Sequence, residues 1–201
     1  KADDLQKVKE ILTELRGILN EMPLLCTFRT KQEGGEKPIG LQDYTAFYES
    51  VVQTGLADLI DAELSAGEEA VRQLVAAAHA NGVKVIASNH NFSHTPQKAE
   101  IIQKLCSMQE LGADLLKIAV MPQSSADVLT LLSATEQMRR ESAKRPVITM
   151  AMGAAGVISR ICGETFGSAV TFAAVGKTSA PGQMQVEELA QILSSLHHCM
   201  G

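Results

Sequence analysis

A lysine inside an otherwise apolar segment is the residue that most strongly suggests chemistry. Lys117 lies in Leu115–Met121, a run typical of a buried strand. Because side chains alternate along a strand, Lys117 shares one face with Ala119 and Met121, and larger aliphatic residues occupy the other. Burial disfavours the ammonium form, and a neutral amine can attack a carbonyl to form a Schiff base. The alternative, a lysine at the entrance of a strand that reaches back to water, fits Lys84 better.

A histidine follows another apolar segment. His90 comes directly after the predicted strand Val83–Asn89, at the strand end where a general acid or base can meet a ligand. His94 lies in the same loop and is the weaker candidate. A loop histidine that only satisfies backbone groups remains an open alternative.

Further polar residues follow other predicted strands. Arg29 and Glu33 could hold substrate hydroxyls or orient an imidazole, or they could form a surface ion pair of little consequence. Arg160 lies among apolar neighbours, where a guanidinium suits bidentate binding of a carboxylate. The segment Ser179–Gln183 reads as a loop that could close over a ligand, or as a plain turn before the last helix.

The elements that must position these residues alternate between two periodicities. Short apolar runs predict strands at Leu24–Arg29, Leu59–Leu64, Val83–Asn89, Leu115–Met121, Val147–Met152 and Ala169–Val175. Amphipathic segments predict helices at 5–19, Glu68–Asn81, Gln97–Leu111, Ser124–Ser142 and Gln185–Cys199. Strands separated by helices pair in parallel through right-handed crossovers, so the chain is an α/β protein.

A doubly wound open sheet and an incomplete eight-stranded barrel both fit this alternation. No GxGxxG motif follows the first strand, and polar residues gather at the C-terminal ends of strands, where a barrel builds its active site. A full barrel takes about 250 residues. The prediction is therefore a single (β/α) barrel domain over residues 1–201 that lacks its first two strands.

Composition limits the function classes. The chain has 201 residues, a net charge of −5 and no cluster of Lys and Arg, which argues against a nucleic-acid partner. No apolar run approaches the ~20 residues of a membrane span, and no leader opens the sequence. Four dispersed cysteines without a CxxC pair predict neither a disulfide framework nor a zinc site, and they suggest a cytoplasmic protein.

Taken together, six stretches resemble the type I 3-dehydroquinate dehydratase family over nearly the whole chain. Each is weakly specific, but they occur in the family's order, each after a predicted strand. They are Thr27–Arg29 with Glu33–Glu36, Ile60–Leu64, Ser88–Phe92, Lys117–Gln123, Gly156–Arg160 and Ser179–Gln183. The resemblance implies a (β/α)8 TIM barrel, usually a homodimer, that acts in the shikimate pathway and converts 3-dehydroquinate to 3-dehydroshikimate and water.

The resemblance also implies roles for individual residues. Lys117 forms the imine, His90 transfers protons, and Glu33 orients that histidine. Arg160 pairs with the substrate carboxylate, and further groups hold substrate hydroxyls and carboxylate: Arg29, Ser179 and Gln183. The residues that match the apolar lining of the family's substrate pocket are Phe92, Met150, Met152 and Phe172. Since the iminium itself withdraws electrons, no metal or organic cofactor is implied.

One departure and two competing functions accompany this interpretation. The family begins with two further strands, the second ending in a Glu-x-Arg-x-Asp motif that does not occur in this chain. Another Schiff-base barrel enzyme, such as a class I aldolase, would also need a strand lysine, but the segment Ser179–Gln183 does not resemble its phosphate-binding glycines. A non-catalytic binding or scaffold barrel is the alternative outside enzymes.

Overall fold

The computed structural model describes the backbone of residues 2–200 and the side chains from residue 4 to residue 200. Residues 1 and 201, the ends of the predicted domain, lie outside the described residues. The chain forms two compact units. Unit 1 comprises residues up to 89 together with 110–115, and unit 2 comprises residues 90–109 and those from 116 onward. The single barrel domain over residues 1–201 stays a prediction.

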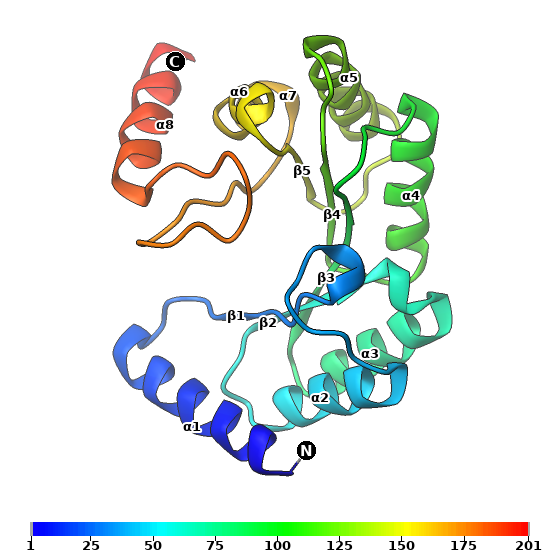
Figure 1. Cartoon of the computed structure of the whole chain (residues 1–201), viewed down its shortest axis with the longest axis vertical. Coiled ribbons are helices and arrows are strands. Elements are labelled where there is room, and N and C mark those ends of the chain that lie inside the picture. Colours follow the sequence, from blue (N-terminus) through cyan, green and yellow to red (C-terminus); the bar gives the residue numbers. More distant parts are fainter. Residues whose placement is uncertain (1, 201) are drawn as a thin grey trace. The chain divides into compact units, whose positions relative to one another are not determined.

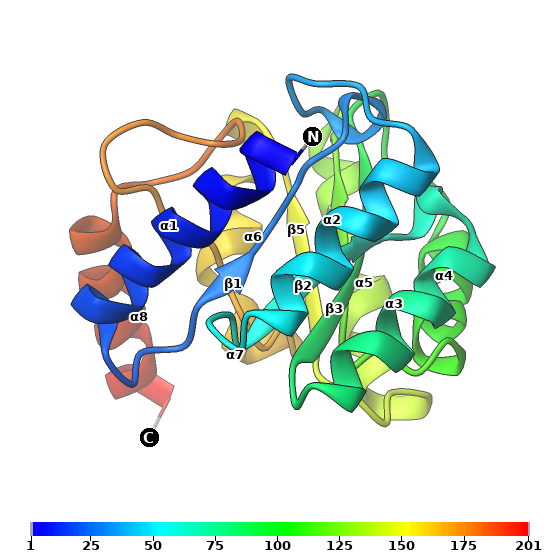
Figure 2. The same ribbon diagram turned by 90° about the horizontal axis from the view of Figure 1, so that it is seen from below.

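Unit 1 is a parallel sheet covered by helices. Its elements are α1 (Ala2–Leu19), β1 (Leu25–Cys26), a 3-10 turn (Lys31–Glu33), α2 (Leu41–Gln53), β2 (Leu59–Glu63), a second 3-10 turn (Leu64–Ala66), α3 (Glu68–Ala80) and most of β3 (Lys84–Asn91). Strand β1 pairs with β2, and β2 pairs with β3, both in parallel. Helices α2 and α3 run side by side (Figure 2).

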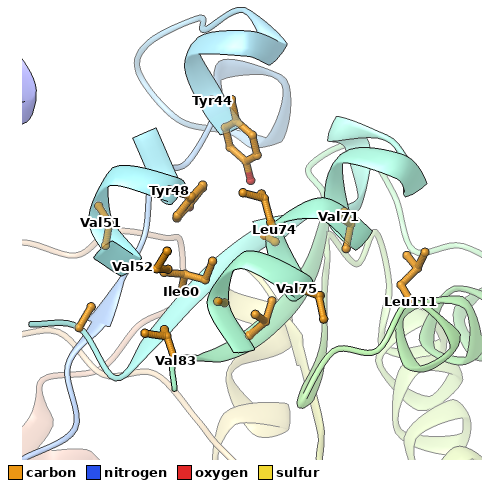
Figure 3. Close-up of a cluster of buried hydrophobic side chains, with 14 of the residues drawn as sticks. Tyr44, Tyr48, Val51, Val52, Ile60, Val71, Leu74, Val75, Val83 and Leu111 are labelled. Carbon is orange, nitrogen blue, oxygen red and sulfur yellow. The ribbon is translucent and has the colours of Figure 1, made fainter. Parts of the chain in front are cut away.

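The core of unit 1 lies between these helices and β2. Figure 3 shows side chains of α2 and α3, among them Val52 and Leu74, gathered around Ile60 of β2. Each of the three is at most 1% exposed. Full burial of such a side chain contributes about 1.5–3 kcal/mol, so this cluster is the main stabilising element of the unit.

Two tyrosines of α2 connect this core to the polar ends of the strands. The Tyr48 hydroxyl donates to the Asp61 carbonyl at 2.6 Å and accepts the Phe28 N–H at 2.9 Å. The Tyr44 hydroxyl accepts the Glu63 N–H at 2.8 Å. Burial raises the pKa of both phenols, so they stay neutral. The core helix therefore fixes the backbone where β1 and β2 end.

Unit 2 contains the other two strands. Its elements are α4 (Lys98–Glu110), β4 (Leu115–Val120), α5 (Ser125–Glu141), β5 (Val147–Ala151), a 3-10 turn (Ala154–Gly156), α6 (Val157–Ile161), α7 (Gly163–Phe166) and α8 (Val186–Met200); the last residue of α4 and the first of β4 belong to unit 1. Strands β4 and β5 pair in parallel and run alongside α5 (Figure 1). A capping box of Ser124 and Asp127 begins α5.

Most predicted elements match the structure, and two predicted strands do not. The segment Leu24–Arg29 forms a strand only at Leu25–Cys26. The predicted strand Ala169–Val175 is wrong: the segment makes isolated bridges at its margins, and Val175 is 86% exposed. Helix α2, which carries much of the core, was not predicted. Among residues 2–200, no helix is both long and apolar enough for a membrane span.

Candidate active site

Lys117 is buried in β4, as the alternation predicted. Its side chain is 6% exposed, and its register partner in β5 is Ile148. The Lys117 Nζ lies 4.6 Å from the ring centroid of Phe172. A ring face at this distance stabilises a positive nitrogen, by about 2 kcal/mol where water is excluded. The structure therefore brings together two of the predicted site residues and gives the lysine nitrogen a defined position.

Arg160 is held by three parts of unit 2. It belongs to α6, is 1% exposed, and donates from Nη2 to the Pro181 carbonyl at 3.1 Å. Its Nη1 lies 3.7 Å from the Met150 Sδ. Burial lowers the pKa of this guanidinium. Its Nε is buried and has no hydrogen-bond partner among the described residues, which is unusual for a buried donor.

The loop after residue 175 forms a closed set of contacts. The Gln183 Oε1 accepts the Ser179 N–H at 2.7 Å, and the Gln183 Nε2 donates to the Ser179 hydroxyl at 3.0 Å. The Gly153 N–H donates to the Pro181 carbonyl at 3.1 Å. The structure thus brings Ser179 and Gln183 together, on the loop that also contacts Arg160.

Gly182 is required for this contact between the loop and Gly153, which lies just after β5. Its φ is +77°, and a Cβ there would lie 2.5 Å from the Gly153 carbonyl oxygen. We expect Gly182→Ala to lower the free energy of unfolding by about 2–3 kcal/mol, from positive-φ strain plus displacement of the backbone. Gly176→Ala is the matched control, because φ is +74° with open space around it. Urea denaturation measures both, and equal losses would contradict the close approach.

The remaining candidates of unit 2 lie at or after strand ends. The prediction that His90 follows the strand is wrong by two residues, because β3 continues to Asn91 and His90 is its next-to-last residue, half-buried. Phe92 comes directly after β3 and is 39% exposed. Met152 comes directly after β5, is 1% exposed and donates its N–H to the Val120 carbonyl at 2.7 Å. The other loop histidine, His94, contacts the Ser93 hydroxyl at 2.9 Å.

In unit 1, Arg29 lies in a cluster of buried carboxylates. Its Nη1 donates to the Glu63 Oε1 at 2.7 Å, and its Nη2 donates to the Asp61 Oδ2 at 2.8 Å. The Glu33 carboxylate is 3.7 Å away and accepts from the Asn89 Nδ2 at 3.3 Å. Burial alone would lower the pKa of Arg29, but Asp61 and Glu63 outweigh it and raise that pKa. The surface ion pair considered for Arg29 and Glu33 is thus wrong, since Glu33 is 2% exposed.

Arg29 and Glu33 were predicted as site residues, but the partners of Arg29 were given no role, although they lie in the stretches Ile60–Leu64 and Ser88–Phe92. Asp61, Glu63 and Ser88 are each 0% exposed, and the Ser88 hydroxyl donates to Asp61. A signal was present: Asp61 and Glu63 alternate within an apolar strand and so share one face, which is unusual unless they are paired. Within the described residues, no group of three His, Cys, Asp or Glu side chains could hold a metal ion.

Comparison with known proteins adds independent information. A family model described as "Type I 3-dehydroquinase" matches residues 1–200. The 3-dehydroquinate dehydratase of Clostridioides difficile strain 630 is 54% identical over 195 residues, which cover 97% of this chain and 76% of that protein. The 3-dehydroquinate dehydratase of Salmonella agona is 52% identical, over 96% of this chain and 76% of that protein.

Solved structures agree. A crystal structure of the type I 3-dehydroquinate dehydratase of Clostridium difficile, with covalently modified comenic acid, aligns with a TM-score of 0.94 at 54% identity. That of Geobacillus kaustophilus aligns with a TM-score of 0.94 at 40% identity. These matches cover 97% and 98% of this chain but 77% and 76% of the other chains. They confirm the predicted fold class, an α/β TIM barrel of which this chain represents a part.

Proposed function

This chain belongs to the type I 3-dehydroquinate dehydratase family, and we propose that it removes water from 3-dehydroquinate through an imine on Lys117. The observation that carries the proposal is the position of Lys117, which is 6% exposed inside an apolar strand with its nitrogen above the Phe172 ring. A buried lysine without a catalytic role would need another reason to remain in the core.

The proposed reaction balances as the loss of one water. The neutral Lys117 amine adds to the substrate ketone, and the adduct takes up one proton as it loses water, which gives an iminium. His90 removes a proton from the carbon next to the iminium, which produces an enamine. The enamine expels the hydroxyl on the following carbon, and His90 protonates it as it leaves. Hydrolysis of the conjugated iminium consumes the first water again and releases the product, the free amine and the proton taken up when the iminium formed.

The surroundings of Lys117 suit this sequence. Burial penalises the ammonium form and so favours the nucleophilic amine, because a charge is poorly solvated in the protein interior. The face of Phe172 has the opposite preference and stabilises a cation. Once the iminium forms, that same face stabilises it and the transition state that leads to it. The two effects together favour a nitrogen that reacts as an amine and is held as an iminium.

We propose that polar side chains bind the hydroxyls and the carboxylate of the substrate. Arg160, a guanidinium buried among apolar neighbours, is proposed to hold the substrate carboxylate. Arg29, Ser179 and Gln183 are proposed to hold hydroxyls and carboxylate as well. Apolar contacts are assigned to Phe92, Met150, Met152 and Phe172. Glu33 is proposed to orient His90. Family membership supports this role, and so does the burial of the Glu33 carboxylate.

We further propose a homodimer in the cytoplasm. Family membership supports both statements, and the four cysteines, all of which lie in the described part, are free thiols. The conversion of substrate to product needs no second macromolecule.

The test combines turnover with trapping. The purified protein is incubated with 3-dehydroquinate while the absorbance of the conjugated product is followed, and a second sample is treated with borohydride. We expect product formation and a reduced adduct on the peptide that contains Lys117. Sugar phosphates that serve class I aldolases should leave no adduct. Turnover without an adduct, or an adduct on another lysine, would contradict the proposal.

A further inference from the structure

Two buried carboxylates of β2 surround a single arginine in a way that core packing does not require. Asp61 and Glu63 lie on the same face of the strand, and both are 0% exposed. The parallel register that pairs Leu25 with Leu59 would, if continued, bring Arg29 beside Glu63. The backbone thus brings one cation to two carboxylates at the C-terminal end of the sheet of unit 1.

We propose that Asp61 and Glu63 are positioning residues that hold the Arg29 guanidinium in one orientation for substrate binding, an inference that rests on the proposed function. Each terminal nitrogen of Arg29 has its own carboxylate, Nη1 with Glu63 at 2.7 Å and Nη2 with Asp61 at 2.8 Å. Two charge-assisted bonds to separate anchors fix both the place and the plane of the group.

The anchors are themselves held rigidly. The Glu63 Oε1 accepts the Thr30 N–H at 2.9 Å, and its Oε2 accepts the Thr30 hydroxyl at 2.5 Å. The Ser88 hydroxyl donates to Asp61 and also accepts from the Arg29 Nη1 at 3.2 Å. These hydrogen bonds fix the side-chain conformations of both carboxylates, and the fixed carboxylates in turn restrict the orientation of the Arg29 guanidinium.

The arginine keeps donors for a ligand. A guanidinium has five N–H groups, and the acceptors that it finds among residues 2–200 take three of them. Its side chain is 20% exposed, whereas both carboxylates are fully buried. A ligand can therefore reach part of the Arg29 side chain, whereas the two carboxylates that anchor it are out of reach. An arginine whose only task was to neutralise the carboxylates would not need that exposure.

Stability alone explains the cluster poorly. Replacing buried ion pairs with well-packed apolar residues is often neutral or stabilising, so such a pair is weak evidence for a structural role. Burial also raises the pKa of the Glu63 carboxyl, even though Thr30 and Arg29 oppose the shift. An arginine that is already held in its binding orientation strengthens substrate binding, because the entropy cost of ordering its side chain is met on folding and not on binding.

The test removes the charge and keeps the shape. In Asp61→Asn and in Glu63→Gln we expect the KM for 3-dehydroquinate to rise about tenfold or more, with kcat changed less. Trapping of the Lys117 adduct at saturating substrate should persist. Asp114→Asn is the matched control: Asp114 is another carboxylate of unit 1, bound to Lys84 at 3.1 Å and to His79 at 2.8 Å, and its removal should leave KM unchanged.

Coupling to Arg29 separates positioning from a general effect on folding. In an Arg29→Ala background, Asp61→Asn should add little to KM, because the group that it positions is gone. Additive effects, or an unchanged KM in both single variants, would overturn the proposal while the parent protein still dehydrates its substrate. If Asp61→Asn fails to fold, Glu63→Gln carries the same comparison. A parent protein without turnover or adduct would refute the proposed function, and this inference with it.

Discussion

Replacing Lys117 with alanine should abolish both the borohydride-trapped adduct and the dehydration of 3-dehydroquinate. The amine is the only group proposed to bond covalently with the substrate, and without it the carbon acid must ionise next to a ketone rather than an iminium. Loss of a covalent nucleophile typically lowers kcat by about 10⁴-fold or more. The turnover of the variant should therefore fall to the limit of detection.

Two companion variants separate chemistry from folding. Lys117→Ala leaves a space in a strand that is buried on both faces, whereas Lys117→Met nearly fills it. The methionine variant should be folded and equally inactive. Lys84→Ala removes a lysine whose side chain is 63% exposed at the start of β3, and should keep both adduct and turnover. Retained dehydration in a folded Lys117→Met protein would refute the imine mechanism.

The buried strands were predictable because short segments with apolar residues on both faces are stable only when both faces are buried. Strand β4, for example, has apolar residues on both faces with Gly112 and Pro122 on either side, and the structure differs from the prediction by one residue. Burial of Lys117 followed from the same pattern. A residue in the middle of such a run is expected to be largely buried, whichever face it occupies.

Two errors in the predicted elements, one strand and one helix, arise because both depend on contacts between residues far apart in the sequence. Ala169–Val175 has the composition of a strand, but a strand needs a continuous row of backbone partners, and within the described residues this segment has isolated bridges. Helix α2 was missed because its apolar positions include Tyr44 and Tyr48, whose hydroxyls bond to strand backbones. Such bonds connect residues far apart in the sequence, and no local pattern reveals them.

The same distinction applies to the candidate site, where individual residues could be predicted and their contacts could not. Lys117 and Arg160 were identified because a charge among apolar neighbours is visible in the sequence, and Arg29 because it stands at the end of a predicted strand. Their partners were not, because the contact of Arg160 with the Pro181 carbonyl depends on how a loop returns to Gly153, just after β5. The role of Asp61 likewise depends on the register of β1 against β2. Chemistry could thus be assigned to residues before the contacts that orient them were known.

Replacing His90 with alanine should separate imine formation from dehydration. The Lys117 amine remains, so borohydride should still trap substrate on the protein. Proton transfers of the kind assigned to His90 are worth about 10²–10⁴-fold, and kcat should fall by that factor. The mass of the adduct makes the distinction sharp, because it should correspond to the undehydrated substrate and exceed that of the dehydrated adduct by one water.

His94 supplies the matched control for this variant. It lies four residues further along, is exposed, and contacts the Ser93 hydroxyl in the same loop. His94→Ala should therefore keep kcat within a small factor of the parent, and added imidazole should partly restore turnover in His90→Ala only. If the two variants lost activity equally, the damage would lie in the loop and not in a proton transfer. If His90→Ala accumulated the dehydrated adduct, another group would have to be the base, and the assignment of His90 would be wrong.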